Sequence, residues 1–359
     1  MEHIVEKIVA GNCDSYNIET LKKIFHDGFR EVDFKIGRRK VLLKPNLLSG
    51  RLPEKAVTTH PQFVRALAEL LLDSSCDVYI GDSPGYESTE KALIKSGIMD
   101  VVKDCGLKIL SFNKKITKII QGISPYREFV FGEDPDNFEI IINLPKLKTH
   151  MMMGLTLGVK NTFGFIHALD KAKWHLRAGT DKMLFASMLI DIHNVVKPSI
   201  TIIDGIIGMD GDGPGNGRVR NMGIVALSKN AFALDYYIER LAGIPFALPI
   251  TSKAKEHGIM PDCKVFPFNS PISFVDNLKI PGTMDTNWNL PDMAKRVLKN
   301  MFIKKPKLKK GVCKGCGVCA NICPIGALSV NEKTVFFDYK KCIRCYCCQE
   351  MCPEGAIKV

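Results

Sequence analysis

The chain has 359 residues, of which 46% are hydrophobic, enough for one large domain with its own core and a smaller second domain. Its formal net charge is +12, but the densest basic run, KKPKLKK at 304–310, has no interleaved aromatic residues. That run is typical of a solvated linker and argues against nucleic-acid binding. No run of about 18 apolar residues occurs and no signal peptide pattern opens the chain, so we expect a cytoplasmic protein without a membrane span.

Apolar runs of strand length alternate with amphipathic segments of helix length from about residue 38 to 243, which predicts an α/β domain with a mostly parallel sheet and flanking helices. The predicted strands are residues 40–44, 77–81, 107–112, 138–144, 199–204 and 223–228. The predicted helices include 61–73, 231–243 with Asn230 as its cap, and a last helix at 291–302. We expect an α/β domain at 1–303, the linker at 304–310, and a small α+β domain at 311–359.

Polar and glycine-rich segments directly follow four of these strands. They are KPN from residue 44, GDSPG from 81, PKLKTH from 145 and DGIIGMDGDGPGNG from 204. Ligands of open α/β sheets bind at the carboxyl edge of the strands, so we expect one cleft to collect these segments. The segment that holds His167, Trp174 and His175 is expected to cap this cleft.

Most of the thirteen cysteines lie after residue 312, in CKGCGVCANICP and CIRCYCCQEMCP. Each segment fits C-x2-C-x2-C-x3-C-P, in which three close thiolates hold one four-iron cluster and the cysteine before proline reaches the other cluster. The spacing therefore predicts two [4Fe-4S] clusters, one bound by Cys313, Cys316, Cys319 and Cys352, and the other by Cys342, Cys345, Cys348 and Cys323.

The main alternative to iron-sulfur clusters is structural zinc. Structural zinc sites use two separated cysteine pairs, which this spacing does not provide. Cys347 falls outside the pattern. We expect it to be a buried thiol beside a cluster, although an exchange of roles with Cys348 stays open.

Residues 309–359 resemble bacterial-type ferredoxins, including the short ALSV and AIKV segments after the two motifs. This resemblance implies one-electron transfer between two nearby clusters. It also implies a redox partner protein or another low-potential electron donor.

The GDSPG segment satisfies G-x-S-x-G, the pattern of a nucleophilic serine on a sharp turn. The residue after that serine must donate its backbone N–H to the oxyanion hole, and Pro84 has none. We therefore interpret the segment as a tight turn that brings Asp82 to the cleft.

The segment 143–161 gathers basic and polar side chains within nineteen residues: Lys146, Lys148, His150, Lys160 and Asn161. Lysines at a strand end and near glycines suit a phosphate or carboxylate ligand. His150 can donate a proton or bind a metal ion. The alternatives, a solvated basic loop and a structural histidine, stay open.

Together the KPN, THP, GDSPG, PKLKTH, GVKNTFG and DGIIGMDGDGP segments resemble domain-of-unknown-function family 362 over about residues 3–245. The resemblance supports the architecture but implies no reaction, and members of the family often carry a ferredoxin-like tail. It marks a set of residues as candidates for the site: Lys44, Asn46, His60, Asp82, Lys146, Lys148, His150, Lys160, Asn161 and Asp204.

The leading hypothesis is an anaerobic oxidoreductase that passes electrons from the tail to a small anionic substrate, or to a further cofactor, in the α/β cleft. Lys146, Lys148 and Lys160 would hold the anion, His150 would supply the acid, and Asp82 or Asp204 would orient a partner. Lys44, Asn46, His60 and Asn161 would bind the substrate or cofactor. A carrier or scaffold for a partner enzyme, and a non-redox enzyme with structural or sensing clusters, are the alternatives.

Overall fold

The computed structural model describes residues 5–269, 272, 278–283, 304–332 and 334–359. The helix expected at 291–302 lies outside these residues. No helix in the described part of the chain is long and apolar enough to cross a membrane.

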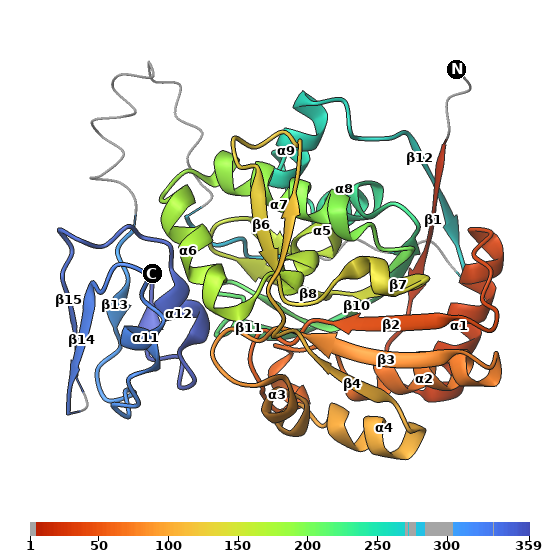
Figure 1. Cartoon of the computed structure of the whole chain (residues 1–359), viewed down its shortest axis with the longest axis horizontal. Helices are drawn as coiled ribbons and strands as arrows, with labels where there is room; N and C mark the ends of the chain where they lie inside the picture. The colour runs from red at the N-terminus through yellow and green to blue at the C-terminus, as the bar shows by residue number, and fades with distance from the viewer. Residues whose placement is uncertain (1–4, 270–271, 273–277, 284–303, 333) are drawn as a thin grey trace.

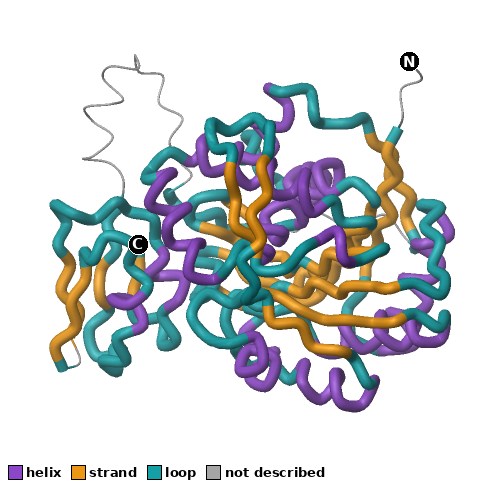
Figure 2. Tube along the Cα trace, viewed as in Figure 1, coloured by secondary structure: helices purple, strands orange, loops and turns teal. Residues whose placement is uncertain are grey.

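A mixed sheet of ten strands forms the centre of the larger part of the molecule (Figures 1 and 2). The strands are β1 Glu6–Asn12, β2 Lys40–Pro45, β3 Asp77–Asp82, β4 Lys108–Ser111, β7 Ile140–Leu144, β8 Lys146–His150, β9 Gly154–Thr156, β10 Ile200–Asp210, β11 Arg218–Ser228 and β12 Cys263–Pro267. Eight of them run in the order β12-β1-β11-β10-β7-β2-β3-β4, while β8 pairs with β10 and β9 pairs with β8. A separate antiparallel pair is formed by β5 Ile116–Ile119 and β6 Glu128–Phe131.

Most strand pairs are parallel, and the antiparallel exceptions in this sheet are β1 with β11, β10 with β11, and β8 with β9. The predicted α/β class is thus confirmed. All six predicted strands occur, although β10 runs on to Asp210 and β11 begins at Arg218. The sequence analysis did not predict β1, β8, β9 or β12.

Helices cover both faces of the sheet (Figure 1). One group packs in the core that contains Val41 and Leu43, and the other packs in the core that contains Leu42. Because alternate residues of β2 face opposite cores, both faces of this strand are apolar, as in a buried parallel sheet. The first group is α1 Ile18–Glu31, α2 Pro61–Asp73, α3 Thr89–Lys95 and α4 Ile98–Cys105, and the second is α5 Gly158–Asn161, α6 Ala168–Ala178, α7 Lys182–Val196, α8 Ala231–Leu241 and α9 Pro249–Glu256. Short 3-10 helices occupy Pro53–Lys55, Pro135–Asn137 and Thr162–Phe165.

The order of the sheet reverses at β2. From β2 the chain adds β3 and then β4 on one side, and it returns to place β7 and then β10 on the other. Such a reversal opens a crevice at the carboxyl ends of the neighbouring strands. Lys44, Asp82 and Lys146 stand at or beside these ends.

The C-terminal region is a small unit beside the sheet (Figure 1). It contains α11 Val318–Asn321, α12 Cys347–Met351, and two antiparallel pairs, β13 Lys307–Leu308 with β16 Ile357–Lys358 and β14 Leu328–Asn331 with β15 Thr334–Phe337. Two residues of the predicted 304–310 linker therefore form a strand of this unit.

Candidate functional site

A pocket opens between the carboxyl edge of the sheet and the C-terminal unit, and the empty space there, open solvent included, is about 650 Å³. Its α/β side comes from the loops after β2 and β3, from α5, from Thr162–Phe165 and from α6. Its other side comes from the ends of α11 and α12. The lining residues are Asn46, Leu48, Asp82, Ser83, Gly85, Lys160, Asn161, Phe163, Gly164, Lys171, Ala172, His175, Ile322, Cys347, Glu350 and Met351.

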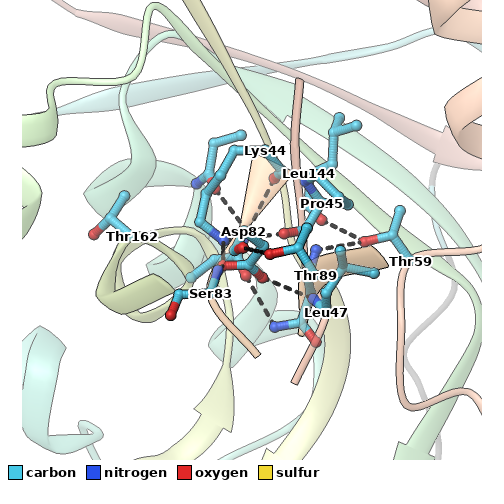
Figure 3. Close-up of polar contacts among 12 residues, drawn as sticks. Lys44, Pro45, Leu47, Thr59, Asp82, Ser83, Thr89, Leu144 and Thr162 are labelled. Carbon is cyan, nitrogen blue, oxygen red and sulfur yellow. Dashed lines mark hydrogen bonds and ion pairs between the residues drawn. The ribbon is translucent and has the colours of Figure 1, made fainter. Parts of the chain in front are cut away.

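Lys44 and Asp82 form a buried ion pair at the floor of this site (Figure 3). Lys44 Nζ lies 2.9 Å from Asp82 Oδ1, and the same carboxylate accepts hydrogen bonds from Leu47 N and Ser83 N, each 2.8 Å. Burial lowers the pKa of Lys44, although Asp82 opposes the shift. The pair therefore joins the ends of β2 and β3 and leaves no free charge at Lys44.

Gly164 lies against this pair. A Cβ atom at Gly164 would overlap both Asp82 Oδ1 and Lys44 Nζ. Glycine is thus required here for space, because the backbone approaches the two charged groups directly.

A hydrogen-bonded network links the predicted residues Asn46, Lys148 and Asn161. Asn46 Nδ2 donates to Asn161 Oδ1 (2.9 Å), and Lys148 Nζ donates to Asn46 Oδ1 (2.8 Å) and to the Val57 carbonyl (2.6 Å). Asn161 Nδ2 donates to Asn143 Oδ1 at 2.8 Å. Burial lowers the pKa of Lys148 strongly. Lys148 therefore lies behind the pocket wall and orients the two asparagines that line it.

A second buried cluster surrounds Asp204. Lys146 Nζ lies 2.8 Å from Asp204 Oδ2, and the Tyr16 hydroxyl donates to Asp204 Oδ1 at 2.8 Å. The His60 backbone N–H donates to Asp204 Oδ2 (2.9 Å), while the His60 ring stacks on Tyr16 with centroids 3.6 Å apart. None of these four side chains lines the pocket, so this cluster is separate from it.

His150 is fully buried and reaches across to the C-terminal unit. Its Nδ1 accepts hydrogen bonds from Met152 N and Met153 N, each 3.1 Å, so the ring proton lies on Nε2. Nε2 is 2.8 Å from Glu350 Oε1. Burial lowers the pKa of His150 to about 4, so the ring beside this carboxylate is neutral. Glu350 lines the pocket, whereas His150 stands behind it.

Two lysines bring positive charge to the pocket itself. Lys160, at the end of α5, is engaged by no hydrogen bond or ion pair within the described residues, and burial lowers its pKa. Lys171, on α6, donates from Nζ to the Ser83 carbonyl. Three buried polar atoms of the lining residues, Ser83 Oγ, His175 Nδ1 and Glu350 Oε1, also lack a hydrogen-bond partner in the described structure. The arrangement is suited to a small anion with hydrogen-bonding oxygen atoms.

The structure thus divides the predicted residues. Four line the pocket: Asn46, Asp82, Lys160 and Asn161. Lys44, Lys148 and His150 support this wall from behind, and Lys146, His60 and Asp204 form the separate cluster. Lys171 and Glu350 were not predicted, although Lys171 and His175 are four residues apart, the spacing of one helix face.

Two further cavities in the C-terminal unit are lined by cysteines. One has Cys313, Cys316, Cys319 and Cys352 in its wall, and the other has Cys323, Cys342, Cys345 and Cys348. Each set combines three cysteines of one motif with the cysteine before proline of the other. The donor sets and their grouping fit two four-iron clusters.

Cys347 lines both the second cysteine cavity and the pocket. It belongs to α12, which carries Cys348 toward the cavity and Glu350 toward the pocket. One residue therefore separates the two spaces.

Comparisons with known proteins agree with this organisation. A family model described as "Domain of unknown function (DUF362)" matches residues 41–240, and one described as "4Fe-4S dicluster domain" matches residues 312–356. The thylakoid-associated protein sll1697 of Synechocystis sp. is 31% identical over 270 residues, which cover 74% of this chain and 84% of that protein. The dicluster match confirms the prediction of two [4Fe-4S] clusters.

Among solved structures, the lactate racemase apoprotein of Thermoanaerobacterium thermosaccharolyticum aligns with a TM-score of 0.38 and 13% sequence identity. The alignment covers 66% of this chain and 57% of the racemase chain, which is less than two thirds of that protein.

Proposed function

The chain belongs to the DUF362 family and carries a 4Fe-4S dicluster domain for iron-sulfur electron transfer, and from this premise we propose that it is an oxidoreductase. Its substrate is a small anion that binds in the pocket between the two domains. Electrons enter through the dicluster domain and leave in the pocket. The proposed domains are 1–303 and 311–359, joined at 304–310.

The observation that carries this proposal is the shared position of Cys347. The residue lines the cavity of Cys323, Cys342, Cys345 and Cys348, and it also lines the pocket. A substrate in the pocket would lie one residue away from the proposed cluster site. A carrier that served only partner proteins would not need a pocket there.

We assign the clusters to the two cysteine sets predicted from the spacing. Cys313, Cys316, Cys319 and Cys352 would hold one, and Cys323, Cys342, Cys345 and Cys348 would hold the other. When bound, each cluster supplies one electron at a time at a low potential. A low-potential donor protein is the proposed partner, in an anaerobic, cytoplasmic setting.

Of the three lysines predicted to bind the anion, Lys146, Lys148 and Lys160, we propose that only Lys160 does so. Lys146 is paired with Asp204, and Lys148 is bonded to Asn46 and the Val57 carbonyl. Lys160 lines the pocket with its ammonium group free of a protein partner in the described structure. A carboxylate of the substrate would supply that partner.

The test is reoxidation of the anaerobically reduced holoprotein. Dithionite-reduced protein, freed of excess reductant, is mixed with a panel of 2-oxo and 2-enoic monocarboxylates, with acetate as a non-reducible carboxylate. Return of the visible cluster absorbance is followed. We expect at least one acid to reoxidise the protein with saturation, and Lys160→Gln to raise the half-saturating concentration without loss of iron.

Two results would contradict the proposal. One is that no acid of the panel reoxidises the protein faster than acetate does. The other is reoxidation that never saturates and is the same in Lys160→Gln, as expected for a carrier that reacts at its surface.

A further inference from the structure

Reduction of an organic group takes up protons as well as electrons, and a positioned side chain supplies them. His150 was predicted for this role, but it stands behind Glu350 and does not line the pocket. Its Nδ1 is occupied by two backbone N–H groups and its Nε2 by Glu350. The proton donor must therefore be sought among the side chains of the lining itself.

Four titratable groups of the lining are poorly suited to donate. Glu350 lies 2.8 Å from His150 Nε2, and although burial opposes the shift, His150 and Lys160 lower its pKa to about 2, which marks it as an ionised carboxylate. Burial lowers the pKa of His175 to about 4, so its ring carries no extra proton at neutral pH. Cys347 also lines the second cysteine cavity together with Cys345, on the cluster side. Asp82 is held as a carboxylate by Lys44 and two backbone N–H groups.

Lys171 differs from these groups in its position. It enters the pocket from α6, and its Nζ donates one hydrogen bond to the Ser83 carbonyl. An ammonium group has three donors, so two remain for a molecule in the pocket. Ser83 Oγ and His175 Nδ1, both unpartnered within the described residues, line the same space.

We propose that Lys171 is the catalytic proton donor to the substrate that is reduced in this pocket, an inference that rests on the proposed function. A carbon–carbon or carbon–oxygen double bond of the substrate takes up two electrons and two protons. The electrons come one at a time from a low-potential one-electron donor by way of the dicluster domain. One proton comes from the Lys171 ammonium, the second comes from water, and water returns a proton to the amine after product release.

The charges around Lys171 suit this role. Burial, opposed by Asp82 and assisted by Lys44 and Lys160, lowers the pKa of Lys171 to about 7. The Lys44 and Asp82 charges belong to one ion pair and largely offset each other. Lys160 is then the positive charge that most favours the neutral amine. A donor that titrates near the working pH can both release and regain a proton.

The first experiment needs no substrate. The anaerobic holoprotein is acylated with a trace of acetic anhydride over a series of pH values, and labelling of each lysine is measured by mass spectrometry. Lys171 should reach half of its maximal labelling near pH 7. Lys160→Gln removes a neighbouring positive charge and should move that midpoint to higher pH. Lys173, exposed two residues away on α6, serves as the reference for reagent reactivity.

The second experiment uses the reoxidation assay with an acid that saturates the wild type. Lys171→Met should lower the maximal rate by about 100-fold or more with little change in half-saturation or iron content. Methylamine added to Lys171→Ala should restore part of the rate. Lys173→Met is the matched control and should behave as the wild type.

The inference is overturned if Lys171 and Lys173 label with the same pH dependence in both proteins, or if Lys171→Met keeps the wild-type rate and pH profile. In both cases saturable reoxidation by the wild type would leave the proposed function intact. If no acid reoxidises the wild type with saturation, the proposed function fails and the inference fails with it.

Discussion

His150 of β8 and Glu350 of α12 join the two domains through one buried contact, with Nε2 and Oε1 2.8 Å apart. Two hydrogen bonds near this contact also join the two domains. Asn216 Nδ2 donates to the Gln349 carbonyl at 2.7 Å, and Gln349 Nε2 donates to the Asp212 carbonyl at 2.6 Å. The dicluster domain thus contacts the carboxyl edge of the sheet through α12, the helix that also forms one side of the pocket.

Removal of the histidine should therefore weaken the junction between the domains. In His150→Leu the buried Glu350 carboxylate loses the polar ring nitrogen that lies 2.8 Å from it, at a cost of about 1–3 kcal/mol in the free energy of unfolding. Glu350→Gln should cost less, because its amide keeps a polar oxygen beside Nε2 and buries no charge. Urea unfolding of the anaerobic holoprotein measures both values. Equal stability of His150→Leu and the wild type would contradict the role given to this contact.

The pairing of His150 with Glu350 could not be read from the sequence, because the two residues are 200 positions apart and belong to different domains. Strand periodicity did predict that residues 145–150 follow a strand and reach the cleft edge. Periodicity does not show that β8 then continues beside β10, which turns Lys146 toward Asp204 and Lys148 toward Asn46. The pairing of β8 with β10 thus determines that Lys146 and Lys148 are engaged by other side chains.

The C-terminal domain was more predictable than the cleft. A cluster loop is specified by short cysteine spacings, which the sequence displays directly, and the four-cysteine cavities group as those spacings predict. The cleft instead depends on side chains from six separate segments. Lys171 belongs to the segment that was expected to cap the cleft, but only its spacing with His175 marked Lys171 itself.

Gly164 should tolerate no side chain. In Gly164→Ala the new methyl group would overlap the Lys44–Asp82 ion pair and displace it. We expect a loss of about 1–3 kcal/mol in the free energy of unfolding. Gly37→Ala is the matched control, because no heavy atom lies within 4 Å of a Cβ built there. A Gly164→Ala protein as stable as Gly37→Ala would show that the backbone can move away from the pair.

The stability of the α/β domain should fall as the pH rises through the titration of Asp235 on α8. Burial raises the pKa of this carboxyl from 3.8 to about 8. The backbone N–H groups of Val159 and Gly158, at the start of α5, donate hydrogen bonds to the carboxylate and oppose the shift. Between these two values the folded state binds more protons than the unfolded state. The free energy of unfolding therefore decreases with pH in that window, by at most about 1.4 kcal/mol per pH unit for one proton.

Asp235→Asn tests this relationship, because the amide does not titrate. Urea unfolding at several pH values from about 4 to about 8 should give a flatter pH dependence for Asp235→Asn than for the wild type. Glu239, whose pKa burial raises to about 7, adds a slope of the same sign and remains in both proteins. Parallel curves for the two proteins would argue that Asp235 is ionised in the fold.

Cys347 and Cys345 should differ in their effect on iron content, although both are buried in the same segment. Cys345 is a proposed ligand, so Cys345→Ala should lower the iron from about eight to about four atoms per chain. Cys347→Ala should keep about eight, because this cysteine falls outside the ligand spacing. It should still change the spin-resonance spectrum or potential of the neighbouring cluster, since Cys347 lines the cavity of that cluster's proposed ligands. Iron analysis and low-temperature spin resonance of anaerobically purified variants measure both effects. Loss of half the iron in Cys347→Ala, with full iron in Cys348→Ala, would instead assign the ligand role to Cys347.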